Sequence, residues 1–335
     1  MKNKIIKLIT WIILLFLVLL AISIIAISTG TSKIPFKIVT ACLFLQGKNC
    51  SITDADIILK IRMPRILLGF AVGSALSLCG VILQGMFRNP LVEPYTLGIS
   101  GGAALGVCLC IALGLNKNIG IIAIPYAGLI GAGCVIFIIY LLNVSRGRLK
   151  IHGLLLSGVM VSFICASLFM LIMAIVGAED LQGIIFWTMG TLEQPVAYLI
   201  KVMMVVSVGG LIIASFFSKE LNAFSLGAEQ ALHLGVNTER IMMILFFTTS
   251  ILTGVSVSVA GIIGFVGLVI PHFMRHLVGT DHRLLLITSY LSGGIFLIIC
   301  DTIARTIISP LELPVGVITG IIGGAAFIIA LLKKE

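Results

Sequence analysis

Long, uninterrupted apolar stretches constrain the fold of this sequence more than any other feature. A helix needs about 20 consecutive apolar residues to cross the hydrocarbon core of a bilayer, and the chain contains about ten such stretches. Because they are continuous and do not alternate, they predict an all-α polytopic membrane protein with about ten transmembrane helices. The stretches cover residues 8–28, 62–84, 96–115, 119–142, 152–176, 197–217, 240–260, 262–278, 284–304 and 313–332.

The composition agrees with this fold class. Of the 335 residues, 59% are hydrophobic and 10% are charged, whereas a soluble domain usually carries about 25% charged residues. No stretch is polar enough for a soluble domain, so we expect one transmembrane domain over residues 1–335 with a cytosolic loop at about 218–239. The net charge of +9 resides in short basic groups between the apolar stretches, which indicates membrane orientation and not nucleic-acid binding.

The basic residues also predict how the chain is oriented. With the N-terminus in the cytoplasm, Lys and Arg are modestly more frequent on the inner side. This predicts a multi-pass protein of the cytoplasmic membrane, whose first apolar stretch is too long for a signal peptide and is a retained anchor. The exceptions gather on the outer side, at Arg62, Arg65 and Arg305. There they either have a function or bind lipid phosphate.

A weak internal repeat links two parts of the chain. Arg65 opens the second stretch and precedes a glycine-containing segment and Pro94, while Arg240 opens the seventh stretch and precedes a similar segment and Pro271. The first copy runs from outside to inside and the second begins inside. Such an inverted repeat is common in transporters.

Two segments have residues that are unusual in a membrane span, prolines in one and a pair of opposite charges in the other. Pro90 and Pro94 forbid a continuous helix after the second stretch. Irregular backbone at membrane depth is tolerated only inside protein or beside a cavity, so we interpret this segment as a gate. Asp301 and Arg305 are four residues apart in the ninth stretch, and their spacing allows a pair within one helix.

Several chemistries lack their motifs. No GxxxxGK[ST] occurs, so the sequence carries no phosphate-binding loop for ATP. No nucleophile set emerges, and we predict no catalytic residue, no cofactor and no resident metal. His272 and His276 share a helix face, but no carboxylate or thiolate accompanies them as a further ligand. Cys42 and Cys50 share a polar loop, where they either pair or stay reduced.

Motifs from about residue 55 to 332 together resemble the FecCD permeases, which are the membrane subunits of ABC importers for iron–siderophores, haem and vitamin B12. The resemblance implies the type II ABC importer fold, as in the vitamin B12 permease, and transport of an iron chelate, with cobalamin or haem as the alternative. The motifs are, in order, Arg62-Met-Pro-Arg65, Gly80–Pro94, Gly261–Arg275, Asp281–Arg283, Asp301–Arg305 and Glu312–Gly316.

The resemblance also implies partners and functional residues. It implies a homodimer with the path between the two copies, two cytosolic ATPase subunits and an extracytoplasmic substrate-binding protein. Three outer arginines would receive the binding protein: Arg62, Arg65 and Arg305. Three residues fall where the family places its inner gate: Asn89, Leu91 and Ile151. Lys150-Ile151-His152 departs in character from the small polar residues that the family pattern has at this place.

The cytosolic loop carries a short amphipathic segment between two glycines. Such a helix either lies on lipid or docks into a groove of a partner, and the few basic residues on its polar face favour docking. We interpret it as the element that couples to the ATPase, with Ala228, Ala231 and Leu232 on its docking side and with Glu229 and His233 as the more polar residues. Its residues are Gly227, Ala228, Glu229, Ala231, Leu232 and Gly235.

Small residues recur along the stretch 152–176 and allow close approach of another backbone. Ordinary helix packing explains most such rows. This one we place near the path and the dimer axis, through Ser157, Gly158, Ser162 and Ala166.

The rival class is a secondary transporter driven by an ion gradient. It requires a charged coupling site at mid-membrane. No Asp, Glu, Lys or Arg occupies the middle of the third to seventh or of the tenth stretch, and this disfavours the rival.

Overall fold

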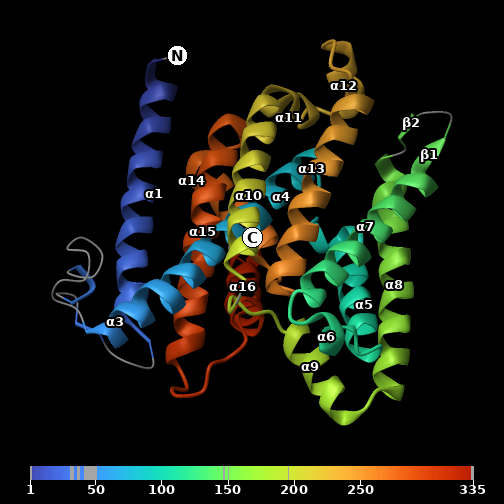
Figure 1. Ribbon diagram of the computed structural model, residues 1–335. Coiled ribbons are helices and arrows are strands. Elements are labelled where there is room, and N and C mark those ends of the chain that lie inside the picture. Colours follow the sequence, from blue (N-terminus) through green and yellow to red (C-terminus); the bar gives the residue numbers. More distant parts are fainter. Residues whose placement is uncertain are drawn as a thin grey trace.

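The computed structural model describes residues 2–30, 34–35, 38–40, 51–145, 148–149, 151–194 and 196–332, and this part of the chain is almost entirely helical (Figure 1). A two-residue hairpin, β1 (Val144–Ser145) with β2 (Arg148–Leu149), pairs Val144 opposite Leu149. The longer helices are α1 (Lys2–Ser28), α4 (Met63–Phe87), α5 (Ile99–Ala112), α7 (Ala123–Asn143), α8 (Ile151–Ile175), α10 (Ala197–Phe216), α13 (Thr238–Ala260), α14 (Val266–Val278), α15 (His282–Thr306) and α16 (Val315–Leu332). The shorter helices are α3 (Ile52–Asp56), α6 (Leu115–Ile119), α9 (Ala178–Thr188), α11 (Ser218–Phe224) and α12 (Ala228–His233).

Each of the ten predicted stretches falls on one of the longer helices, so the all-α prediction is confirmed. Among the described residues, seven helices are long and apolar enough to cross a membrane. The other three, α5, α14 and α16, are shorter. A helix of 13 residues such as α14 is about 20 Å long, against about 30 Å of hydrocarbon. Helices α5 and α14 therefore need the adjoining irregular segments to cross, whereas α16, with 18 residues, is nearly long enough by itself.

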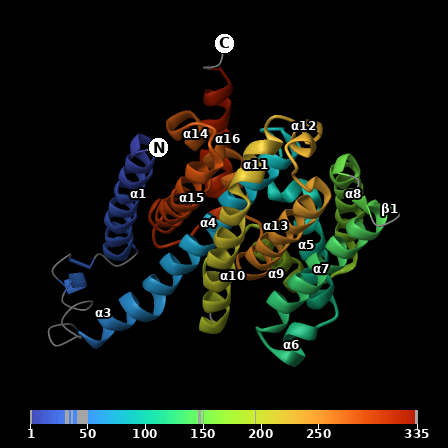
Figure 2. The same ribbon diagram turned by 90° about the horizontal axis from the view of Figure 1, so that it is seen from above.

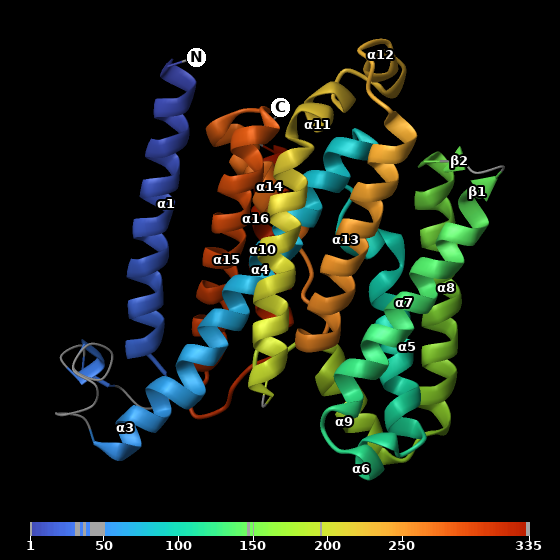
Figure 3. The ribbon, with the colours of Figure 1, turned by 45° about the horizontal axis from the view of Figure 1, so that its top comes forward.

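The two ends of the molecule carry different elements. The N-terminus, α11, α12 and the β1–β2 hairpin lie at one end, which we call the α12 end, and α3, α6 and α9 lie at the other, the α3 end (Figures 1 and 3). Helices α1 and α8 stand at opposite edges of the bundle (Figure 2). Helix α4 begins near the α3 end, whereas α13 begins at the α12 end, and these opposite directions agree with the inverted repeat.

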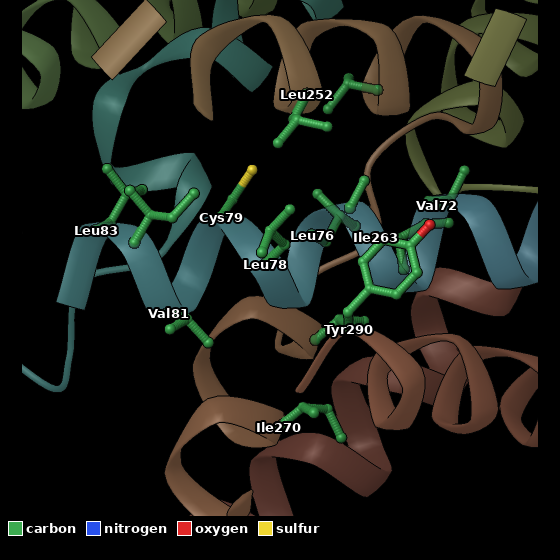
Figure 4. Packing of buried hydrophobic residues seen from close by; sticks show 14 of the residues in the cluster. Val72, Leu76, Leu78, Cys79, Val81, Leu83, Leu252, Ile263, Ile270 and Tyr290 are labelled. Atoms are coloured by element: carbon green, nitrogen blue, oxygen red, sulfur yellow. The ribbon is translucent and has the colours of Figure 1, made fainter. Parts of the chain in front are cut away.

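Helix α4 forms the centre of the bundle. A π-helical segment, Ile57–Arg62, joins α3 to α4, so that residues 52–87 form one continuous span. Of its apolar 18-residue stretch, 89% is buried inside the protein. A helix that is apolar all round is expected in the interior. Residues of α4, among them Leu76 and Cys79, pack against Leu252 of α13, Ile270 of α14 and Tyr290 of α15 (Figure 4).

Glycines bring the backbone of α4 into direct contact with two neighbouring helices. A Cβ atom on Gly73 would lie 2.3 Å from the carbonyl oxygen of Gly293 in α15, and one on Gly80 would lie 1.8 Å from that of Gly267 in α14. Both distances are far shorter than any real carbon–oxygen contact. Close approach of this kind maximises dispersion contacts between membrane helices.

The chain between α13 and α14 is irregular but its backbone groups are hydrogen-bonded. Gly261 and Phe265 both have positive φ, of 72° and 69°, and Phe265 adopts the left-handed helical conformation. The Tyr95 hydroxyl donates to the Ile263 carbonyl (2.7 Å) and accepts from the Ile263 N–H (3.1 Å), and the Gln194 amide donates to the Val259 carbonyl (3.1 Å). These contacts replace the helical bonds that a break at membrane depth would otherwise lose.

The contact at Gly80 can be tested by adding a side chain. We expect Gly80→Val to lower the free energy of unfolding by about 3 kcal/mol or more, because the backbone of α14 cannot move away without opening the core. The measurement is the thermal melting of the purified chain in detergent. Gly133→Val is the matched control, because a Cβ atom on Gly133 meets nothing within 4 Å. Equal melting of the two variants would contradict the packing described here.

Candidate functional site

The three predicted outer arginines lie together at the α3 end. Arg62 ends the π-helical segment, Arg65 lies in the first turn of α4, where Pro64 occupies an early helical position, and Arg305 lies in the last turn of α15. All three side chains are buried, although guanidinium groups usually reach water. We call these arginines, with Asp301 and Glu312, the arginine cluster.

Two carboxylates hold the arginine cluster together. The Arg305 Nε donates to the Asp301 Oδ2 (2.9 Å), and the Arg65 Nη2 lies 3.5 Å from the Asp301 Oδ1. The Arg65 Nη1 donates to the Glu312 Oε2 (2.6 Å). The pair of Asp301 with Arg305, which their spacing allows, is therefore confirmed, and Arg65 links it to the loop after α15.

The last turn of α1 contributes further acceptors to the arginine cluster. Arg62 donates to the carbonyl oxygen of Ile27, and Arg305 to that of Ala26 (3.5 Å). These carbonyls belong to the last turn of a helix, where they have no intrahelical donor and where the helix dipole favours cations. The buried guanidinium groups and the C-terminus of α1 thus satisfy each other.

The predicted gate segment is irregular, as Pro90 and Pro94 require. Helix α4 ends at Phe87, Arg88 adopts a left-handed conformation with φ of 50°, and the next element is a short 3₁₀ turn, Pro94–Leu97. The Asn89 Oδ1 accepts from the Leu91 N–H (2.9 Å), which stabilises a tight turn. Asn89 and Leu91 are exposed at the α12 end. Ile151 begins α8, and its side chain lies outside the described residues.

The predicted coupling segment forms a helix, α12, between Gly227 and Gly235, whose φ values of 124° and 81° favour glycine. One expectation about it is wrong. Ala231 is fully buried against its own chain, whereas Leu232 is 59% exposed, so they do not share a docking side. Glu229 is exposed as well, and the side chain of Ala228 lies outside the described residues. The exposed apolar residues here are Leu226, Leu232 and Leu234.

The small residues of α8 contact elements of the same chain. A Cβ atom on Gly158 would lie 3.0 Å from the Thr96 carbonyl oxygen, and the Ser157 hydroxyl accepts from the Asn143 amide (2.6 Å). Ser162 approaches Gly98, and Ala166 is exposed. Intrachain packing thus accounts for the size of Gly158 and Ser162, and their place at a subunit path stays a prediction.

Residues that commonly bind metals do not gather in the described part of the chain, which holds no group of three or more His, Cys, Asp or Glu suited to a metal ion. The Nε2 atoms of His272 and His276 lie 3.3 Å apart, and the His272 ring packs edge-on against Phe327. Cys42 and Cys50 lie outside the described residues.

The sequence model that describes the FecCD transport family matches residues 14–333 of this chain. The chain belongs to the FecCD transport family. Its helical architecture and the absence of an ATP-binding loop from the sequence agree with this assignment, because the proteins similar to it are permeases of ABC importers. This FecCD protein is accordingly a multi-pass permease subunit of an ABC importer.

Relatives and a solved structure are similar to this chain over most of its length. An uncharacterised ABC transporter permease, YvrB of Bacillus subtilis, is 38% identical over 94% of this chain and 92% of its own. The hemin transport permease HmuU of Yersinia pestis is 37% identical over 86% and 87%, and the cobalamin import permease BtuC of Halobacterium salinarum 38% over 84% and 75%. A metal-chelate type ABC transporter in an inward-facing conformation superposes with a TM-score of 0.84 and 29% identity, covering 96% of this chain and 98% of that one.

Sequence reasoning identified the arginines but missed most of their partners. Glu312 is 247 residues from Arg65, and the acceptors on α1 are backbone carbonyls, which carry no sequence signal. Only the pairing of Asp301 with Arg305 could be predicted, because the two residues are four positions apart.

Loss of a carboxylate inside the arginine cluster should destabilise the chain much more than loss of a carboxylate on the exposed surface. Asp301→Asn leaves two buried guanidinium groups without their shared counter-charge, and we expect it to destabilise the chain by about 3–5 kcal/mol. Asp56→Asn is the matched control, because Asp56 pairs with Lys60 on the exposed surface (2.8 Å) and contributes less than about 0.5 kcal/mol. Thermal melting of both variants measures the difference, and similar melting temperatures would refute a stabilising role of Asp301.

Proposed function

We propose that this permease translocates an iron chelate of the siderophore type across the cytoplasmic membrane. The observation that carries the proposal is the whole-chain similarity to a metal-chelate type ABC transporter. In this proposal two copies of the chain enclose the path, two separate ATPase subunits hydrolyse ATP, and an extracytoplasmic binding protein delivers the chelate. Relatives named for hemin and cobalamin make these two compounds the alternative substrates.

The proposal places the α12 end in the cytoplasm. The N-terminus and α12 lie at the same end of the bundle (Figure 3), so a cytoplasmic N-terminus, as the basic residues favour, exposes α12 to the ATPase. The arginine cluster then lies at the outer surface, where a binding protein arrives. Residues Asn89, Leu91 and Ile151 would form the inner gate, and α8 would face the second copy along the path.

For coupling, we propose that the exposed leucines of α12 seat in a groove of the ATPase. Leu232 lies on α12 and Leu234 follows its last residue, and both are exposed, while Ala231 on the inner side of the helix is buried. Apolar anchors on a short helix are the usual basis of helix-in-groove docking. Movement of the ATPase would then pass to the permease as a rigid-body displacement of α12.

The leucines of α12 give a direct test. Leu232→Glu should weaken co-purification of the ATPase by about tenfold or more, since loss of a central apolar anchor typically costs about 2 kcal/mol or more. Membrane insertion and melting should not change, because the side chain is exposed. Leu113→Glu, a change at an equally exposed leucine beside α6 at the other end, is the matched control. Full ATPase recovery with Leu232→Glu would exclude this docking element.

For the binding protein, we propose that its acidic residues meet the arginine cluster by taking the place of Glu312. Glu312 is 38% exposed and holds the outermost guanidinium contact of Arg65. A carboxylate of the partner can bind the same fork bidentately. In this proposal Glu312 closes the cluster while no binding protein is present.

The role of Glu312 predicts a gain in affinity. Glu312→Gln removes the competing carboxylate, so the binding protein should bind roughly fivefold tighter, the size expected for an accessible ion pair. Surface plasmon resonance at low and high salt measures this. Asp180→Asn is the control, because it removes an acidic group that pairs with Lys117 at the same end (2.9 Å) without touching the cluster. Weaker binding after Glu312→Gln would oppose the exchange of carboxylates.

Uptake into proteoliposomes tests the substrate. Vesicles that contain the permease and its ATPase, with the binding protein outside and ATP inside, should accumulate a radiolabelled ferric siderophore. Haem and cyanocobalamin should accumulate at least about tenfold more slowly, since discrimination of this size needs only about 1.4 kcal/mol. Faster uptake of haem or cyanocobalamin would replace the siderophore with that compound. Uptake that depends on an ion gradient and does not depend on ATP would favour a secondary transporter.

A further inference from the structure

A cleft at the α12 end adjoins Asn89 of the proposed gate and is otherwise lined by residues to which the proposed transport function assigns no role. It has a volume of about 340 Å³ and lies where the end of α4, the end of α11, and the turn between α14 and α15 meet. None of the described residues that line it is acidic. The lining residues that matter here are Gln84, Arg88, Ser225, Arg275, Thr280 and His282.

One guanidinium group is held at the wall of the cleft. The Gln84 amide nitrogen donates to the carbonyl oxygen of Gly267 (3.2 Å), which orients its Oε1 to accept from the Arg275 Nη2 (3.0 Å). A guanidinium group has five N–H donors, and this bond uses one. Arg275 is therefore oriented while most of its donors stay available to a ligand.

A buried imidazole gives the cleft its chemical character. His282 is only 4% exposed, and Asn222 Oδ1 lies 2.9 Å from its Nδ1. The Asn222 amide nitrogen donates to Asp281 (2.9 Å), so its oxygen faces the ring and Nδ1 is the donor. In the neutral ring Nε2 is then an acceptor. It has no hydrogen-bond partner among the described residues and lies beside Gly85, where a Cβ atom would be 2.8 Å away.

We propose that this cleft binds a singly protonated phosphate group, either inorganic phosphate or a phosphomonoester. Arg88 and Arg275 would hold the charged oxygens, as arginine does in phosphate sites generally. The P–OH group would donate to the Nε2 of His282. The hydroxyl groups of Ser225 and Thr280 are further donors along the wall.

The unpartnered acceptor distinguishes phosphate from other anions. At neutral pH sulfate and carboxylate carry no proton, so neither can donate to Nε2 and each would leave it unsatisfied, at the cost of a buried acceptor without a partner. A phosphodiester lacks the P–OH group as well. The site should thus prefer phosphate to sulfate, and phosphatidic acid to phosphatidylglycerol.

Occupancy of the cleft would connect the proposed gate with the proposed coupling helix. Arg88 directly precedes Asn89 of the proposed gate, and its guanidinium Nη1 lies 3.5 Å from the position of a Cβ atom on Gly227, at the start of α12. A phosphate bound to Arg88 would therefore tie the end of α4 to the base of α12.

Phosphate and sulfate titrations of the purified full-length chain test the proposal. Thermal melting in detergent at neutral pH is followed at constant ionic strength, so that screening of surface charges stays equal. Phosphate should raise the melting temperature, and sulfate should need at least about tenfold higher concentration for the same rise. Equal effects of the two anions would overturn the proposal.

Variants and lipids complete the test. Arg88 and Thr280 are exposed, so Arg88→Gln and Thr280→Ala should fold, and Arg88→Gln should weaken phosphate binding by about tenfold or more. Arg240→Gln, at an exposed arginine outside the cleft, should change nothing. In nanodiscs, stabilisation by phosphatidic acid but not phosphatidylglycerol would show that the membrane also supplies the group. Phosphate binding that survives both Arg88→Gln and Thr280→Ala would place the anion elsewhere and refute the site.

Discussion

At Gly73 and Gly80 the backbone of α4 touches the backbones of α15 and α14, and the rest of the permease is arranged around these two contacts. In a bilayer, apolar side chains gain little by leaving lipid for protein, so helices associate through close packing of small residues. A side chain at either glycine would separate the helices by more than the neighbouring core can absorb. The central position of α4 follows from this packing, and so does its burial on all sides.

The same helix leads to a proposed functional region at each of its ends. Its first turn places Arg65 in the arginine cluster. There Asp301 supplies a negative charge to the buried guanidinium groups, and carbonyl oxygens at the end of α1 accept hydrogen bonds from them. Its last turn leads into Arg88 and the irregular segment beside α12 and the proposed phosphate cleft. A displacement of α4 along its length would consequently be felt at both surfaces of the membrane, which is what an importer driven from one side requires.

The sequence predicted the helices well because each apolar stretch is long and because Pro90 and Pro94 stop a helix by their own covalent structure. It also predicted the pair of Asp301 with Arg305, since a spacing of four residues is local information. Burial of individual side chains was harder to foresee. Ala231 and Leu232 are adjacent and both apolar, yet one faces the chain and the other faces outward, because the tertiary fold decides which side of a six-residue helix is covered. Glu312 belongs to a motif of the sequence, but its pairing with Arg65, 247 residues away, had no local spacing to indicate it. The carbonyl groups of α1 carry no sequence pattern at all.

The central claim is that events at the arginine cluster and at α12 are coupled through the permease, with ATP hydrolysis supplied by a separate subunit. The most direct measurement is the ATPase rate of the reconstituted permease–ATPase complex in nanodiscs, where both surfaces are accessible. Adding chelate-loaded binding protein should raise the rate several-fold, and Glu312→Gln should lower the concentration of binding protein needed for half of that rise. An ATPase rate that does not respond to the loaded binding protein, although the protein binds, would contradict coupling between the two ends.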